Sequence, residues 1–379
     1  MKRASLWMAA ALLAGCTEGG LVEPTREPRH QVSTAYWGVN QDGDLLDDGV
    51  EWDLANRYAP LLYLPFPIPQ GFPLNGDWTR PANVEWMLQN TRLRIHHNNC
   101  SDHQLLDFGQ VNATNLIQQA HKRYLRKWWG GCEHENPVQY SNGSWHDDDH
   151  YFLQQVDGTH PGIADPAQWV TYFHAYPNTS GGVSIQYWVL WAYNDWTGSL
   201  NHEADWEHVN VRLDANHQPI GVYFAAHNDL NWYGASDVQW FDGTHPMVWV
   251  ADGSHSAYRS QSACNTTLYP LDEGECWTLD WWRWFTWSGG SGGYEGLQGA
   301  GLVNMGEKSA PMPGQQWLRY SGRWGEVGMA DGTSGPRGPA YNKNGWWTTD
   351  LAVPYVPPPP PPEECVPEPP MVYCPVSSK

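Results

Sequence analysis

Four short runs of apolar residues, each broken off by Gly, Asn, Asp or Pro, constrain the fold of this chain most strongly. They are VSIQYWVLWAY (183–193), HVNVRL (208–213), IGVYFAAH (220–227) and PMVWVAD (246–252). Runs of this length, rich in Val, Ile, Tyr and Trp and bounded by turn residues, are typical of β-strands. The link DANHQP between the second and third runs suits a hairpin. The sequence therefore predicts a mainly β fold, a β-sandwich.

One stretch of the chain has helical instead of alternating spacing. In NATNLIQQAHKRYLRKWW (112–129), apolar and aromatic side chains recur every four positions, at Leu116, Ala120, Tyr124 and Trp128. Asn112 or Thr114 can cap this helix, and the Gly130-Gly131 pair can end it. We therefore expect a β-sandwich with one or two helices in insertions.

The balance of charges limits the partners that the chain can bind. Asp and Glu number 41 and Lys and Arg 21, which gives a formal net charge of −20. Proteins bind phosphate backbones through clustered Lys and Arg, so we expect no nucleic-acid partner.

The first residues have the pattern of a lipoprotein signal peptide. Lys2 and Arg3 precede the apolar run LWMAAALLAGC, which is too short to span a bilayer. Its end, Leu13-Ala14-Gly15-Cys16, resembles the bacterial lipobox, in which the cysteine is lipidated. The alternative is an ordinary signal peptide with a chance cysteine. We expect residues 1–16 to be the signal peptide and a lipid on Cys16 to bind the membrane. Thr17 resembles a sorting signal for the outer membrane of a Gram-negative cell envelope.

The two flanks of the chain differ in composition from its middle. Residues 17–35 are polar with scattered Pro, which indicates a tether. Residues 351–379 contain a polyproline run and read as an extended tail.

The remaining cysteines are even in number, as expected for disulfides in an oxidising compartment. Proximity along the chain favours the pairs Cys100–Cys132, Cys264–Cys276 and Cys365–Cys374, although six cysteines allow other pairings.

The stretch NHEADWEHVNVRLD (201–214) places two carboxylates on the core face of a strand. If it is extended, Asp205 and Glu207 share a face with Val209 and Val211. A buried carboxylate costs several kcal/mol unless its charge is compensated, and a bound cation would do this. The alternative is that the strand end lies in water and only Val209 onward is buried.

Several residues near these carboxylates in sequence are further candidate ligands. His202 lies in the preceding loop, Asp195 ends the preceding strand candidate, and His227 ends the following one. The predicted set is therefore Asp195, His202, Asp205, Glu207 and His227, and the expected cofactor is a divalent cation, Ca²⁺ or Mg²⁺.

A second acidic stretch, NQDGDLLDDGVE, has the spacing of a calcium loop. The residues at loop positions 1, 3, 5, 9 and 12 are Asn40, Asp42, Asp44, Asp48 and Glu51. Leu45 stands where the sharp turn of such a loop favours Gly. Residues 36–55 are thus a possible calcium-binding loop, with a solvated acidic turn as the alternative.

Several separate motifs resemble the vacuolar protein sorting-associated protein 62 family. They are RYAPLLYLP (57–65), RPANVEWMLQNTRLR (80–94), IQYWVLWAYND (185–195), EADWEHVNVRLD (203–214), YFAAHND (223–229) and WVADGSHSAY (249–258). The resemblance covers about residues 57–350 and implies that residues 56–350 form one domain. In this motif set His255 is a possible pocket residue.

The same region has a weaker likeness to the necrosis-inducing cytolysins, whose hallmark heptapeptide is Gly-His-Arg-His-Asp-Trp-Glu. His202, Asp205, Trp206 and Glu207 match four of its positions, whereas Asn201, Glu203 and Ala204 depart from it. The likeness implies a β-sandwich that binds a divalent cation at an acidic cavity.

The favoured hypothesis is a lipid-anchored protein outside the cytoplasm whose cation site recognises a surface ligand, a carbohydrate or a polar lipid headgroup. This favours binding over catalysis. The alternatives are a metal-dependent hydrolase that uses the His/Asp/Glu cluster, with His227 or His255 as general base, and a membrane-active, cytolysin-like protein.

Overall fold

The computed structural model describes most of the chain between residues 38 and 342, together with two short strands near its end. The described ranges are 38–66, 77–96, 102–120, 123–124, 128–129, 132–133, 150–178, 181–195, 200–226, 229–265, 276, 281–289, 296–328, 331–342, 366–368 and 371–374. Within these ranges no helix has the length and apolar character needed to cross a membrane.

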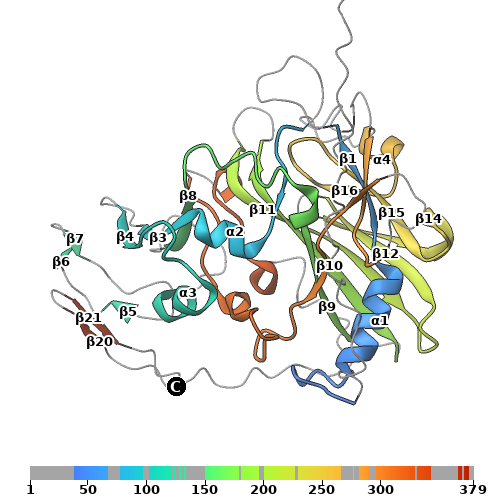
Figure 1. Ribbon diagram of the computed structural model, residues 1–379, viewed down its shortest axis with the longest axis horizontal. Helices are drawn as coiled ribbons and strands as arrows, with labels where there is room; N and C mark the ends of the chain where they lie inside the picture. The colour runs from blue at the N-terminus through green and yellow to red at the C-terminus, as the bar shows by residue number, and fades with distance from the viewer. Residues whose placement is uncertain are drawn as a thin grey trace, which may run out of the picture.

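The larger of two main sheets contains three of the four predicted strands. Its strands are β2 (Pro81–Ala82), β9 (Val170–Pro177), β10 (Val183–Asn194), β11 (His202–Leu213), β12 (Pro219–Ala226), β13 (Asp229–Gly234) and β19 (Gly301–Asn304). They lie in the order β13-β12-β11-β10-β9-β19, with β2 paired to β10. The central strands β9 to β12 can be followed in Figure 1. β11 and β12 form the predicted hairpin, and β11 begins six residues earlier than the run 208–213 indicated.

The second sheet packs against the first. Its strands are β1 (Leu61–Pro65), β14 (Trp240–Phe241), β15 (His245–Val250), β16 (Ala257–Tyr258), β17 (Trp281–Phe285) and β18 (Leu297–Gln298). Their order is β14-β15-β1-β17-β18, with β16 paired to β15. The main core lies between the two sheets, and it takes alternate residues of β10, from Val183 to Trp191, against Leu62, Val248 and Trp284. The predicted class, a mainly β sandwich, is confirmed.

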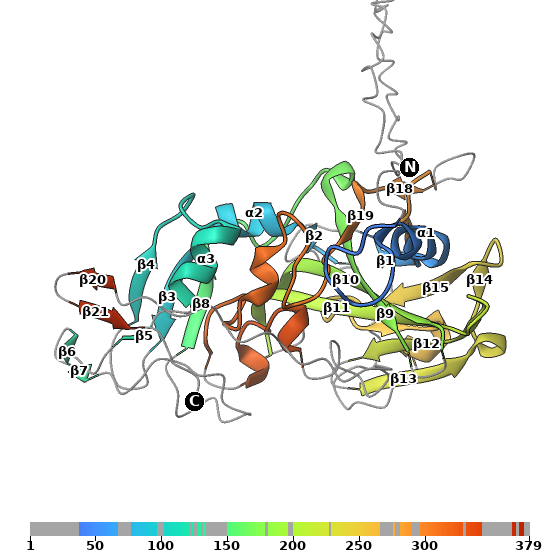
Figure 2. The same cartoon turned by 90° about the horizontal axis from the view of Figure 1, so that it is seen from below.

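The opposite face of β10 and β11 is also buried. Trp188, Leu190 and Trp206 pack there in a second core against β3 (Thr91–His96), β8 (His150–Gln155) and the segment around Trp317. β4 (His103–Leu106) completes the small sheet β4-β3-β8, which lies beside the sandwich (Figure 2). Because both faces of β10 are covered, its sequence from Tyr187 to Tyr193 is continuously apolar and aromatic instead of alternating.

The described ranges contain four short α-helices. They are α1 (Asp48–Tyr58), α2 (Val84–Gln89), α3 (Ala113–Ala120) and α4 (Gln261–Asn265). α1 contacts β9, β15 and β19, and its residues Leu54, Ala55 and Tyr58 join the main core. α1 therefore spans the position, between residues 55 and 56, where the acidic loop was expected to end and the domain to begin.

The helix predicted over 112–129 is too long. Asn112 caps α3 as expected, because its Oδ1 accepts hydrogen bonds from the backbone of Thr114 and Asn115 at 3.0 Å. Beyond Ala120, however, the described residues are extended, in β5 (Arg123–Tyr124) and β6 (Trp128–Trp129). β5 pairs with β21 (Met371–Cys374), which also pairs with β20 (Val366–Glu368), and β6 pairs with β7 (Cys132–Glu133). Tyr and Trp favour strands, so a helical spacing of aromatics was an ambiguous signal here.

The structure confirms one predicted disulfide and leaves the other pairs open. Cys264 and Cys276 are bonded, with their Cα atoms 5.6 Å apart. Cys100 and Cys365 lie outside the described residues, and so does Cys16 with the whole predicted signal peptide and tether. Cys132 and Cys374 lie in the short strands β7 and β21.

Candidate functional site

Asp205 and Glu207 face the interior of the sandwich, as the alternation predicts. In the β10–β11 pair, Asp205 lies opposite Trp191 and Glu207 opposite Val189, two residues of the main core. Glu207 also lines a small cavity between the sheets together with Val209 and His255. Asp205 is 5% exposed, so its carboxylate is buried, whereas Glu207 is half-buried.

A buried histidine supplies the positive charge that Asp205 requires. His255 donates from Nδ1 to Asp205 Oδ2 at 2.9 Å, and its Nε2 lies 3.1 Å from Asp77 Oδ2. Its ring stacks on Trp191 with centroids 4.1 Å apart. Burial acts to lower the pKa of His255, but the charge of Asp77 and the hydrogen bonds to both carboxylates outweigh it and raise the pKa to about 9. A buried imidazolium therefore lies between two carboxylates.

The neighbouring hydroxyl group is part of the same hydrogen-bond network. Thr79 Oγ1 donates to Asp77 Oδ1 at 2.7 Å and lies 2.8 Å from His255 Nε2. Since the protonated histidine donates from Nε2, it does not take the proton of Thr79. Thr79 is therefore not an activated nucleophile in this arrangement.

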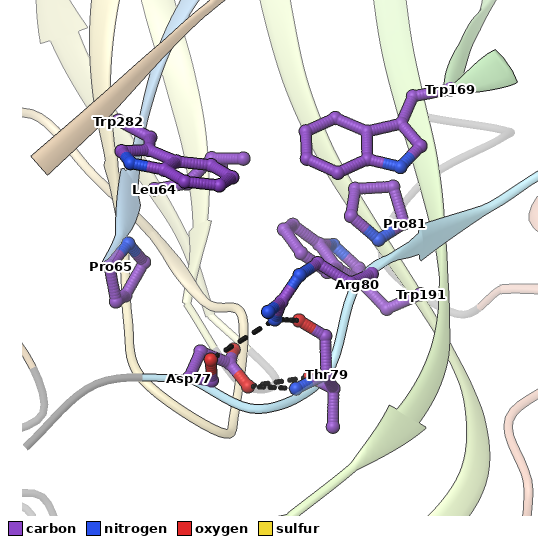
Figure 3. Close-up of a pocket in the computed structure, with 9 residues that line it drawn as sticks. All are labelled: Leu64, Pro65, Asp77, Thr79, Arg80, Pro81, Trp169, Trp191 and Trp282. Carbon is purple, nitrogen blue, oxygen red and sulfur yellow. Dashed lines mark hydrogen bonds between the residues drawn. The ribbon is translucent and has the colours of Figure 1, made fainter. Parts of the chain in front are cut away.

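A narrow pocket adjoins this network on the side of Asp77 (Figure 3). Arg80 projects into it among Trp169, Trp191 and Trp282, and its Nη1 donates to the backbone carbonyls of Asp77 at 3.1 Å and Thr79 at 2.8 Å. The arginine thus holds the turn that carries Asp77.

Two other residues of the predicted set make separate contacts. Asp195 accepts hydrogen bonds from Trp78 Nε1 and from Asn201 Nδ2, the latter at 2.7 Å. His202 Nδ1 lies 2.7 Å from the carbonyl oxygen of Ala204. His227 lies outside the described residues. Of the four predicted ligands that the structure describes, no three bring ligand atoms within 4.8 Å of one another.

The acidic loop before α1 does gather its carboxylates. Asp42, Asp44 and Glu51 each offer an oxygen, and these oxygens all lie within 4.8 Å of one another. Asp47 caps α1 by accepting from the backbone of Gly49 and Val50, so the helix begins inside the loop. Because Glu51 is in the first turn of α1, it is carried back toward the two aspartates.

Each of the three gathered carboxylates has one buried oxygen without a hydrogen-bond donor. Asp42 is 5% exposed and Glu51 0%, and one oxygen of each of the three residues is buried without a partner. Burial, followed by the charges of Asp44 and Glu307, raises the pKa of Asp42 to about 7. Burial and the charges of Asp42 and Asp44 raise the pKa of Glu51 well above its usual range. These are the properties of carboxylates that bind either protons or a metal ion.

The other two predicted loop ligands serve the loop itself. Asn40 Oδ1 accepts from the backbone of Gly43 at 2.6 Å, and both oxygens of Asp48 accept from Gln41, from its backbone at 3.0 Å and its side chain at 2.7 Å. Leu45 adopts φ +83°. The turn that favours Gly is therefore present with a leucine, at a cost of roughly 1–2 kcal/mol.

Two residues that the sequence did not single out adjoin this cluster. Asn304, the last residue of β19, donates from Nδ2 to Glu51 Oε2 at 2.6 Å. Glu307 follows three residues later and acts on the pKa of Asp42 through its charge. Both lie more than 250 residues after the loop, and no local pattern links them to it.

Comparisons with known proteins give one weak similarity. No family model and no curated protein matches the sequence. The solved structure of Necrosis and Ethylene inducing Protein 2, from the causal agent of cocoa's witches' broom disease, is similar over 55% of this chain and 67% of that chain. The sequence identity is 15% and the TM-score 0.29. At this TM-score the similarity carries no argument about the site or its chemistry.

Proposed function

We propose that this chain is an exported, lipid-anchored envelope protein that binds Ca²⁺ through Asp42, Asp44 and Glu51 and recognises a polar ligand on a surface. The observation that carries the proposal is the convergence of three carboxylates whose buried oxygens have no hydrogen-bond donor. A buried carboxylate oxygen without a donor costs free energy, and a divalent cation offsets that cost for all three residues together. Membership of the vacuolar protein sorting-associated protein 62 family is part of this proposal and rests on the sequence motifs.

Calcium is favoured over magnesium by the way the ligands are supplied. The three carboxylates come from one short loop and the helix that follows it, at positions 3, 5 and 12 of a calcium-loop spacing. Mg²⁺ requires a nearly ideal octahedron and retains several waters, whereas Ca²⁺ accepts an irregular, mainly protein-derived oxygen shell.

An exposed tryptophan that packs on a half-buried tyrosine supports a carbohydrate as the ligand. Trp232 on the edge strand β13 is 40% exposed and pairs with Tyr223 on β12, with their ring centroids 4.6 Å apart. The indole of Trp232 lies over Gly221, where a Cβ atom would meet the ring at 2.3 Å. Because this position is a glycine, the ring lies against the sheet, and such an exposed ring is suited to stacking on a sugar.

A hydrolase with His255 as general base is not favoured. Both ring nitrogens of His255 lie against buried carboxylates, so neither is available to take a proton from water. A second cation at Asp195, His202, Asp205, Glu207 and His227 stays a prediction.

Retention on immobilised polysaccharides and on lipid vesicles in Ca²⁺ tests the ligand class. We expect the wild type to be retained on a polysaccharide, the Trp232→Ala variant to pass through, and Phe66→Ala to be retained. Phe66 is the matched control because it is an aromatic residue with a similar exposure, 36%, directly after β1 of the second sheet. Retention on vesicles alone would instead assign a lipid headgroup, and equal retention of all three variants would contradict the role of Trp232.

A further inference from the structure

We infer that Glu307 completes the calcium site, so that one cation joins the N-terminal loop to the end of β19. The inference rests on the proposed Ca²⁺ site at Asp42, Asp44 and Glu51 and adds a ligand from the opposite end of the domain.

The first observation is an unpaired oxygen on a buried side chain. Glu307 is 4% exposed, and its Oε1 accepts a hydrogen bond from His174 Nε2 at 2.8 Å. Its other oxygen, Oε2, is buried and has no hydrogen-bond partner. Leaving such an oxygen unpaired in a buried region costs free energy unless a cation or a proton is bound there.

The second observation is that the segment carrying Glu307 contacts a loop ligand. Asn304, three residues before Glu307, donates from Nδ2 to Glu51 Oε2 at 2.6 Å, and the backbone of Gly306 donates to Asn304 Oδ1 at 2.9 Å. The chain after β19 therefore lies against the loop cluster at Glu51, and Glu307 follows directly in that chain.

His174 fixes the orientation of Glu307. This residue of β9 is fully buried, and its Nδ1 lies 3.3 Å from Gln186 Oε1 while Nε2 bonds Glu307. With acceptors at both nitrogens, the ring donates twice and is an imidazolium. Its bond to Oε1 leaves Oε2 of Glu307 free for the cation, which makes His174 a positioning residue.

The charges show what a cation would offset. With Asp42, Asp44, Glu51 and Glu307 all ionised, the imidazolium of His174 compensates one of four negative charges, and one Ca²⁺ neutralises two more. The oxygens that lie within 4.8 Å of one another belong to Asp42, Asp44 and Glu51, so we place Glu307 behind a bound water. Ca²⁺ takes six to eight oxygens, waters among them.

The consequence is a clamp between distant segments. The cation connects the loop and α1 to β9 and to the chain after β19, and α1 covers the main core with Leu54, Ala55 and Tyr58. Binding of Ca²⁺ therefore stabilises the packing of α1 against the sandwich as well as the loop itself.

Calorimetric titration of the full chain with Ca²⁺ tests the clamp. Glu307→Gln should weaken Ca²⁺ binding by about tenfold or more, and Glu85→Gln, an exposed control on α2, should leave it unchanged. Wild type that binds Ca²⁺ together with a Glu307→Gln variant of equal affinity would overturn the inference and leave the proposed function intact. Wild type that binds no Ca²⁺ would overturn both.

A folding defect is separated from a lost ligand by a second variant and a second measurement. Near-UV circular dichroism in EDTA should be the same for wild type and Glu307→Gln. If the spectra differ, the titration is repeated with Glu307→Asp in place of Glu307→Gln. Aspartate keeps a negative charge near His174, but its shorter side chain moves the carboxylate away from the cation. Weaker Ca²⁺ binding by Glu307→Asp with a native spectrum supports the clamp, and unchanged binding contradicts it.

Discussion

Replacing His255 by alanine is expected to lower the free energy of unfolding by about 3–5 kcal/mol, because it leaves Asp77 and Asp205 buried without their shared counter-charge. The substitution also removes the ring that stacks on Trp191. Urea denaturation followed by tryptophan fluorescence measures the loss, and Glu85→Ala, at an exposed position of α2, should change stability by less than ~0.5 kcal/mol.

A double-mutant cycle gives the sharper form of this prediction. In the wild type, Asp205→Asn should destabilise the fold because it removes one of the two negative charges that stabilise the imidazolium of His255. In the His255→Ala background the same substitution should be neutral or stabilising, since it then removes an uncompensated charge. The reversal should be the same in Ca²⁺ and in EDTA. Additive losses, or a loss that EDTA abolishes, would contradict the assignment of His255 as the counter-charge and favour a metal ion at Asp205.

Replacing Trp206 by alanine is expected to cost about 3–5 kcal/mol, because it empties the centre of the second core. Trp206 is 2% exposed, and its ring contacts those of Tyr172, Trp188, Trp317 and Trp324. The ring of Trp317 lies nearly parallel to it, with centroids 5.6 Å apart. The loss should appear as a lower urea midpoint with an unchanged slope.

Phenylalanine at this position provides the matched comparison. The indole Nε1 of Trp206 is buried without a hydrogen-bond partner, so Trp206→Phe loses no hydrogen bond and keeps an aromatic ring. Its cost should be only about 1–2 kcal/mol. Equal losses for Trp206→Ala and Trp206→Phe would show that this ring does not carry the packing of the second core.

The strands and the direction of their side chains could be predicted because alternation is a local property. The face shared by Asp205, Glu207 and Val209 follows from the two-residue period, and the structure keeps it from Asp205 to Val211. The partner of Asp205 could not be predicted in the same way. His255 lies 50 residues later and reaches Asp205 only because β16 and its turn return to the sandwich.

In the acidic loop, some ligands could be predicted from the local sequence and others could not. Its ligand spacing predicted the meeting of Asp42, Asp44 and Glu51, because one turn and one helical turn bring them together. Asp48 has the right spacing, but it is the first residue of α1 and its two oxygens accept hydrogen bonds from Gln41 instead. Glu307 comes from another strand end and had no signal in the loop sequence.

The metal content of the purified chain tests the central claim most directly. After incubation with Ca²⁺ and desalting, elemental analysis should find about one Ca²⁺ per wild-type chain and per Glu85→Gln chain, and almost none per Glu51→Gln chain. EDTA should lower the melting temperature of the wild type and leave that of Glu51→Gln unchanged. Wild-type protein that retains no Ca²⁺ and melts at the same temperature in Ca²⁺ and in EDTA would contradict the calcium site.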